Sequence, residues 1–214
     1  MNARNFELDQ TAAKEANTGG KRITDHGSYI GTFTAAWYEV NEKGTESVKF
    51  IFTSNEGQEA GPLALYTHNG KGDELPSYKM LNAIMACLKL NRITTKEGSV
   101  KLYDFETKQE ITKQKDTYPE MMGKQIGLVL TSEEYRANNG DLKTRLNIGA
   151  PFEAATNRMA DEVLNKSDSP VALKKYTDYL TAKDKWVKRA APEAYSPPYD
   201  GHPRHDDPFG DDIP

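Results

Sequence analysis

A strongly β-forming stretch near the start of the chain limits the architectures open to it. Residues 27–41 are rich in aromatic and β-branched side chains over a span longer than an ordinary strand. After a short turn, residues 47–53 form a second candidate strand, in which Val48, Phe50 and Phe52 fall on one face. The stretch therefore predicts a sheet that is built on a long first strand and has one apolar face.

The rest of the chain supplies further strands and three helices. We expect a third strand at 63–67, a short strand or extended loop at 99–105, and two more strands at 123–131 and 142–148. Asn139 and Gly140, in the turn between the last two, tolerate positive φ. Apolar residues at spacings of three and four predict a helix over 76–90, and weaker patterns predict helices over 154–164 and 170–189.

Three strands, a helix and then two strands is the plan of the oligonucleotide-binding (OB) fold, a five-stranded, partly closed barrel. We therefore predict a mainly β (α+β) protein: an OB-fold barrel with its helix between strands 3 and 4, extra C-terminal helices and a disordered acidic tail. The expected organisation is a loosely ordered extension at 1–26, the OB domain with its helices at 27–189, and the tail at 190–214.

The tail has a composition that does not pack as a domain. It is rich in proline, and its six acidic residues against one arginine give it a net charge of −5, which leaves about +1 on the rest of a chain whose total is −4. A near-neutral body is compatible with phosphate binding. Carboxylates that steer an encounter and apolar residues that anchor it predict a docking peptide for a partner protein, made of Asp206, Asp207, Phe209, Asp211, Asp212, Ile213 and Pro214.

The end of the chain, Asp211-Asp212-Ile213-Pro214, resembles the C-terminal tip of bacterial single-stranded DNA-binding proteins, where Asp-Asp-Asp-Ile-Pro-Phe follows an acidic linker. The final Phe of that family is absent here, and Phe209 lies upstream instead. When this tip is taken together with the order of elements, the chain resembles phage-type single-stranded DNA-binding proteins. The resemblance implies sequence-independent binding of single-stranded DNA in replication, recombination or repair, recruitment of replication or recombination proteins by the tail, and a possible homo-oligomer.

Such binding needs aromatic faces for the bases and cations for the backbone. The strands offer ten candidates: Trp37, Tyr38, Lys49, Tyr66, Lys101, Tyr103, Tyr135, Arg136, Lys143 and Arg145. A plainer interpretation stands beside each, because strand aromatics commonly pack in a core and basic pairs commonly form a solvated face. Phe33, Phe50 and Phe52 are predicted to be core residues.

The sequence carries no recognisable motif for catalysis, a cofactor or a metal, so we predict no enzyme, no cofactor and no metal site. The sequence has a single cysteine, Cys87, which excludes disulfide frameworks. Cys87 lies in an apolar run and is predicted to be buried. No apolar run is long enough to span a membrane, and no signal peptide is recognisable. We therefore expect no membrane partner and a cytoplasmic location, in the host cytoplasm if the protein is phage-encoded. The alternative function is a non-catalytic protein-interaction or structural module with an OB-like barrel.

Overall fold

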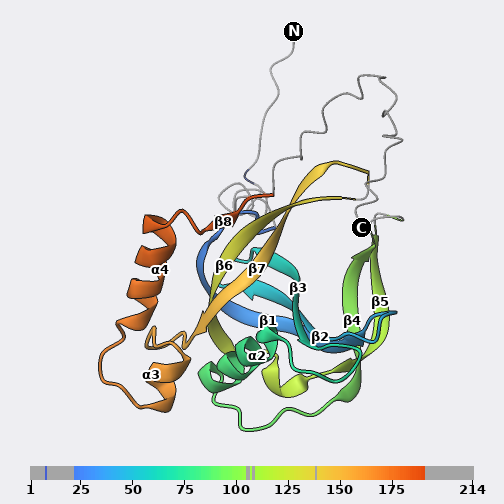
Figure 1. Cartoon of the computed structure of the whole chain (residues 1–214). Coiled ribbons are helices and arrows are strands. Elements are labelled where there is room, and N and C mark those ends of the chain that lie inside the picture. Colours follow the sequence, from blue (N-terminus) through green and yellow to red (C-terminus); the bar gives the residue numbers. More distant parts are fainter. Residues whose placement is uncertain (1–7, 9–21, 105–106, 108, 138, 191–214) are drawn as a thin grey trace, which may run out of the picture.

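The computed structural model describes residue 8 and residues 22–104, 107, 109–137 and 139–190 (Figure 1). Strands dominate this part of the chain. In chain order the elements are β1 (Gly27–Val40), β2 (Glu46–Ser54), β3 (Glu59–His68), α2 (Pro76–Cys87), β4 (Lys96–Asp104), β5 (Gln109–Thr117), the 3-10 turn η1 (Pro119–Met121), β6 (Gln125–Arg136), β7 (Leu142–Phe152), α3 (Ala160–Leu164), α4 (Ala172–Ala182) and β8 (Val187–Lys188).

The long first strand organises the sheet, as its sequence predicts. The N-terminal half of β1 pairs with β6, and most of its length pairs with β2. β3 continues the sheet beyond β2, and β7 beyond β6; all these pairings are antiparallel. No ladder joins β3 to β7 in the described chain, so the sheet is open there. The described chain is therefore mainly β, with an open sheet of eight strands rather than the five predicted, and the pairings are antiparallel except that of β8 (Val187–Lys188) with β6.

The core lies on the concave side of this sheet. Phe33, Phe50 and Phe52 are fully buried in it, which confirms the prediction from their alternation. Helix α2 contributes Leu81 and Ile84 to the core, and its bounds cover most of the helix predicted at 76–90. Burial of these apolar side chains supplies the main stabilisation of the sheet.

Two irregularities of strand register lie on either side of Ile51. β1 contains one extra residue relative to β2, Thr34, and β3 contains one extra residue relative to β2 at Gly61-Pro62, whose peptide bond is cis. A bulge of this kind bends a strand and increases its twist. Because of the first bulge, Phe33 and Ala36 both face the core, whereas Ala35 and Trp37 face outward.

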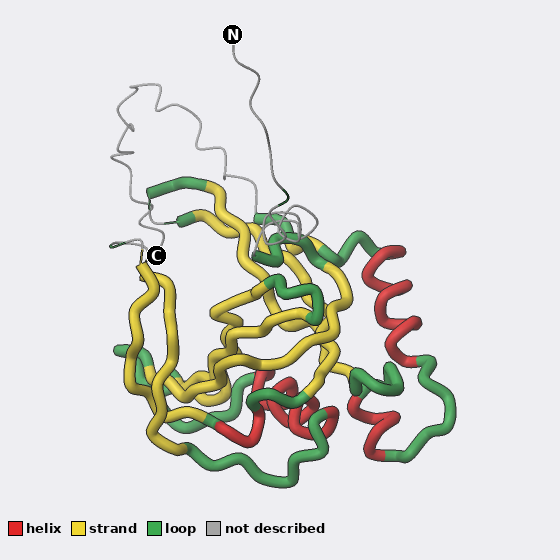
Figure 2. The backbone as a smooth tube through the Cα atoms, turned by 180° about the vertical axis from the view of Figure 1, so that it is seen from behind, coloured by secondary structure: helices red, strands yellow, loops and turns green. Residues whose placement is uncertain are grey.

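A β-hairpin made of β4 and β5 covers part of that outward face. Only a strand or loop at 99–105 was predicted here, and β5 was not predicted at all. Val100 and Leu102 of the hairpin pack on Ala35, Trp37 and Ile51 in a small second apolar cluster. Figures 1 and 2 show this hairpin and the hairpin β6–β7 projecting from the body of the sheet.

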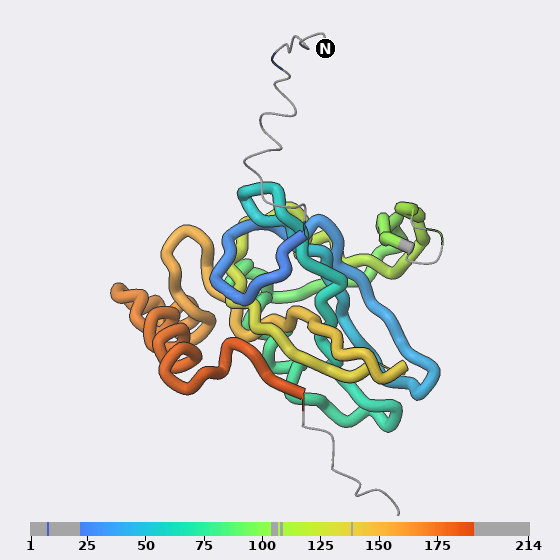
Figure 3. The backbone as a smooth tube through the Cα atoms, turned by 90° about the horizontal axis from the view of Figure 1, so that it is seen from above, coloured from blue at the N-terminus to red at the C-terminus, as the bar shows by residue number. Residues whose placement is uncertain are grey.

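The C-terminal helices lie on the side of the molecule opposite the β4–β5 hairpin, as Figures 1 and 3 show. α4 packs Leu180 against Val129 and Phe152, and the hydroxyl of Tyr176 donates a hydrogen bond of 3.0 Å to the carbonyl of Gly149. The predicted helix at 154–164 is shorter than expected, and the one at 170–189 is wrong beyond Ala182. There the chain turns and runs parallel to β6 as β8.

The predicted N-terminal boundary is also wrong for residues 22–26. Ile23 is buried in the main core, and its amide donates a 2.7 Å hydrogen bond to the carbonyl of Glu59 at the start of β3. The segment therefore belongs to the folded body. Among the helices of the described residues, none combines the length and the apolar character that a bilayer crossing requires.

Candidate functional site

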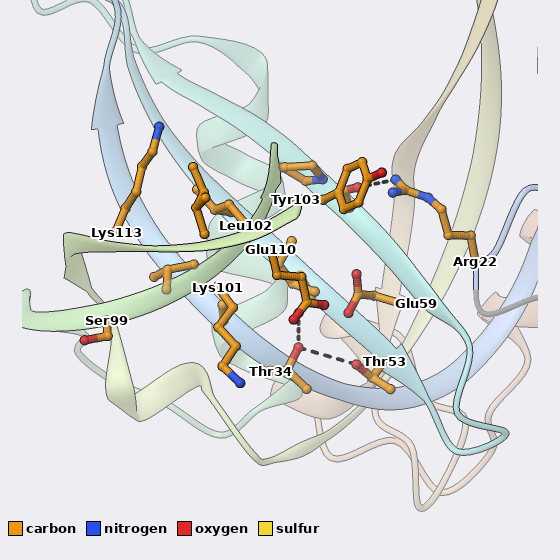
Figure 4. Close-up of a pocket in the computed structure, with 16 residues that line it drawn as sticks. Arg22, Thr34, Thr53, Glu59, Ser99, Lys101, Leu102, Tyr103, Glu110 and Lys113 are labelled. Carbon is orange, nitrogen blue, oxygen red and sulfur yellow. Dashed lines mark hydrogen bonds between the residues drawn. The ribbon is translucent and has the colours of Figure 1, made fainter. Parts of the chain in front are cut away.

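A cavity of about 920 Å³ lies between the β4–β5 hairpin and the outward face of β1–β3 (Figure 4). Ala35 and Ile51 form an apolar floor, and Val100 and Leu102 contribute an apolar wall from the hairpin. The polar rim carries cations, carboxylates, hydroxyls and one aromatic ring: Arg22, Lys101, Lys113, Glu59, Glu110, Thr34, Thr53 and Tyr103.

The two bulges shape this floor. Thr34, the extra residue of β1, turns its hydroxyl into the cavity, 3.4 Å from both the carbonyl of Ile51 and the hydroxyl of Thr53. Gly61, in the bulge of β3, has a φ of +145°, and a Cβ there would lie 2.8 Å from the carbonyl oxygen of Phe50. A side chain at this position would therefore be both strained and overlapping. Bulges commonly re-aim side chains beside a functional site.

A second cavity of about 380 Å³ continues from the first. It lies between β3 and the β6–β7 hairpin, and Arg22, Gly61 and Pro62 line both cavities. The guanidinium of Arg22 donates a 2.7 Å hydrogen bond to the carbonyl of Gly61, which fixes it at the junction. The two neighbouring cavities are together called the groove below, and their lining residues extend from the β4–β5 hairpin across β3 to the β6–β7 hairpin.

An exposed tyrosine marks each end of the groove. Tyr103 lies on the β4–β5 hairpin with 47% of its surface exposed, and Tyr135 lies on the β6–β7 hairpin with 37% exposed. The guanidinium of Arg145 lies 5.3 Å from the centre of the Tyr135 ring, a cation–π arrangement that presents one mixed aromatic and cationic surface.

The cationic side chains of the groove differ in whether a carboxylate is paired with them. Lys101 and Lys113 form no ion pair with another described residue, so their charge is available to an anion. Arg145 is paired with Glu133 at 2.7 Å. Hydrogen bonds from Lys188, and then from Arg145, outweigh burial and lower the pKa of Glu133 to about 2. The free cationic charge is therefore concentrated at the β4–β5 end.

Glu39 fastens the β4–β5 hairpin to the sheet beside the groove. Its carboxylate accepts from Lys49 of β2 at 2.6 Å, from Lys115 of β5 at 3.2 Å and from the indole of Trp37 at 3.0 Å. Burial alone would raise the pKa of Glu39, but these three donors outweigh it and lower the pKa to about 2. The carboxylate therefore stays charged and links three strands.

Four of the ten predicted binding residues line the groove: Lys101 and Tyr103 in one cavity, and Tyr135 and Arg145 in the other. The expectation that Trp37 offers a ring face to a ligand is wrong. Only 1% of its surface is exposed, because the unpredicted β4–β5 hairpin covers it.

The remaining predicted residues lie outside both cavities. Lys49 is paired with Glu39, and burial together with nearby Glu46 raises the pKa of the half-buried Tyr38. Tyr66 is exposed on the outward face of β3. Arg136 and Lys143 lie near the tip of the β6–β7 hairpin, and their part in binding stays a prediction.

Sequence reasoning missed Arg22, Glu59, Glu110 and Lys113. Arg22 precedes the first strand, in a segment assigned to an extension, and only the fold brings it to the junction of the two cavities. Glu110 and Lys113 belong to the unpredicted β5. That strand has one clearly apolar residue, Ile111, so its sequence carries no apolar–polar alternation that could have revealed it.

The predicted docking residues, Asp206, Asp207, Phe209, Asp211, Asp212, Ile213 and Pro214, lie outside the described residues. Within the described part of the chain, no three His, Cys, Asp or Glu side chains gather in a way that could hold a metal ion. Cys87 is buried, and burial, with Glu153 and Asp161 nearby, raises its pKa to about 12. Comparison with protein-family models and with curated proteins gives no match for this chain.

Proposed function

We propose that the protein binds single-stranded DNA in the groove, without reading a defined sequence and without catalysing a reaction. The observation that carries this proposal is the groove itself, which has an exposed tyrosine at each end and, beside one of them, lysines that form no ion pair with another described residue. Tyrosine faces stack on any base, and lysines attract the phosphate backbone without regard to sequence.

The arrangement of strands supports an OB-type barrel as the scaffold. β1 is shared by two halves of the sheet, pairing with β2 on one side and with β6 on the other. α2 follows the third strand, as the OB plan requires, and in that plan β6–β7 would correspond to the final hairpin and β4–β5 to an insertion. OB-folds bind oligonucleotides on the outward face of strands 2 and 3. The groove crosses the equivalent strands, β2 and β3.

In this proposal the protein coats exposed single strands during replication, recombination or repair, and its acidic tail recruits other proteins of those processes. The wider role rests on the resemblance of the tail and on the order of elements. The role of the groove rests on its own geometry and can be tested separately.

The first test is a fluorescence-anisotropy titration of a labelled mixed-sequence 30-mer at salt concentrations from 50 to 200 mM. We expect affinity to fall steeply with salt, and Lys113→Gln to reduce the slope of log K against log salt by about 0.7. Tyr103→Ala is expected to weaken binding about 5-fold to 150-fold, the range for loss of one stacked base.

Lys79→Gln is the matched control, because it removes the same charge from an exposed position on α2 outside both cavities. DNA does not lie in the groove if the slope of log K against log salt is unchanged in Lys113→Gln. The same conclusion follows if Lys79→Gln reduces this slope as much as Lys113→Gln does. Absence of binding at 50 mM salt would exclude the proposal and favour the protein-interaction module.

A further inference from the structure

Two carboxylates lie near the middle of the larger cavity (Figure 4), where a purely electrostatic phosphate channel would have none. Glu59, at the start of β3, and Glu110, on β5, both line the larger cavity, and in Figure 4 both point into it above the hydroxyls of Thr34 and Thr53. Both residues are exposed, and neither is ion-paired with another residue of the described chain. Their charge is therefore presented to whatever fills the cavity.

The cations lie around this acidic centre rather than in it. Lys101 and Lys113 come from the hairpin, and the guanidinium of Arg22 is tied to the carbonyl of Gly61. Glu110 is the register partner of Tyr103 across the hairpin, so a base stacked on that ring lies next to a carboxylate. A strand whose phosphates follow the lysines therefore turns its bases, and not its phosphates, toward Glu59 and Glu110.

A carboxylate can only accept hydrogen bonds, so it distinguishes the edges of the bases. Cytosine, adenine and guanine carry an exocyclic amino group that donates to it, and the pairing of Glu or Asp with the cytosine amino group is a standard recognition contact. The corresponding edge of thymine has two carbonyl oxygens on either side of one N–H, and those oxygens repel a carboxylate.

We propose that Glu59 and Glu110 form a base-selective subsite, which favours bases with an exocyclic amino group and discriminates against thymine. The inference rests on the proposed function, because it assumes that single-stranded DNA occupies the groove. It adds that the protein holds the DNA backbone without sequence preference but selects the base at one position of the bound DNA.

The test compares two 12-mers, one of thymidine alone and one of 5-methyl-deoxycytidine alone. Both bases carry the same ring methyl, so they differ only at the amino or carbonyl edge, and each oligonucleotide presents its base in every binding register. Titrations are made at pH 8, where cytosines are unprotonated. We expect the 5-methylcytosine strand to bind about tenfold more tightly, the effect of one hydrogen bond to a charged acceptor.

The double variant Glu59→Gln/Glu110→Gln is expected to bring the two affinities within about twofold, because an amide offers both a donor and an acceptor. Both side chains are exposed, so the variant should fold, and its thermal transition checks this. Glu97→Gln is the matched control: it removes a carboxylate from an exposed position of the same hairpin outside the cavity and should keep the tenfold preference.

Three results would overturn the inference. Equal affinity of the wild type for both strands, with normal salt dependence, removes the subsite and leaves the proposed function intact. A preference that persists in the double variant shows that other groups select the base. Failure of both strands to bind at low salt removes the inference and the proposed function together.

Discussion

Replacing Glu39 with glutamine tests how the β4–β5 hairpin is held on the sheet. The substitution keeps the shape of the side chain and removes its charge. In the wild type the carboxylate accepts from Lys49, Lys115 and the indole of Trp37, at 2.6, 3.2 and 3.0 Å. The glutamine leaves two lysine side chains, each only 26% exposed, without their counter-charge.

The expected loss follows from the pKa of Glu39, which is lowered from 4.5 to about 2. A shift of this size corresponds to at most about 3.4 kcal/mol, at 1.36 kcal/mol per pKa unit. The side chain is 32% exposed, so solvent screening reduces the figure, and we expect about 1–2 kcal/mol at pH 7. Because the folded-state pKa is the lower one, this stabilisation is complete above about pH 4.5 and is lost as pH falls toward 2.

Urea unfolding at pH 7 and at two pH values below 4.5 measures the effect. Lys115→Met and the double variant Glu39→Gln/Lys115→Met complete a double-mutant cycle. We expect the free energy of unfolding to fall by about 1–2 kcal/mol in Glu39→Gln at pH 7, and by less at each lower pH. The cycle should give a coupling of at least about 0.5 kcal/mol between positions 39 and 115. A loss below 0.3 kcal/mol, or a loss that grows as pH falls, would refute the reasoning.

Three other substitutions or reactions test the packing. Gly127→Ala would put a Cβ 2.0 Å from a ring carbon of Phe152, so it should cost about 1–3 kcal/mol in urea unfolding, and Phe152→Leu should restore part of the loss. Tyr176→Phe leaves the carbonyl of Gly149 without its 3.0 Å donor and should cost about 1–2 kcal/mol, seen as a lower thermal midpoint. The pKa of Cys87 is raised from 9.0 to about 12. The thiol should therefore react with a thiol reagent at pH 8 about a thousandfold more slowly in the native protein than in urea. A native rate within tenfold of the unfolded rate would contradict its burial.

The parts of the fold that the sequence predicts well are those with strong local periodicity. Val48, Phe50 and Phe52 alternate cleanly because one face of β2 is buried in the main core, and the spacing of Leu81 and Ile84 marks the buried face of α2. β5 was missed because its sequence has a single clearly apolar residue, Ile111, and the hairpin residues that pack in the second apolar cluster, Val100 and Leu102, come from β4. Its strand conformation comes mainly from pairing with β4, which local sequence does not encode.

The candidate site was predictable only in part, for a related reason. Tyr103 and Tyr135 were identified because an aromatic beside basic residues on a strand is a local pattern. Burial of Trp37 and the placement of Arg22 depend on contacts between segments far apart in the chain. A groove built from three separate segments therefore cannot be assembled residue by residue from a single sequence.

The paired bulges beside Ile51 have a consequence for comparing this chain with its relatives. Each bulge is one residue that can be lost or gained without a break in the ladder on either side, and loss of Thr34 would leave Phe33 and Ala36 facing the core and Ala35 and Trp37 facing outward. We expect alignments of homologues to need single-residue gaps at position 34 and at 61–62 more often than elsewhere in β1–β3. Homologues with such gaps would keep the hydrophobic core but lose the shape of the groove floor, which makes these two positions sequence markers for the binding surface.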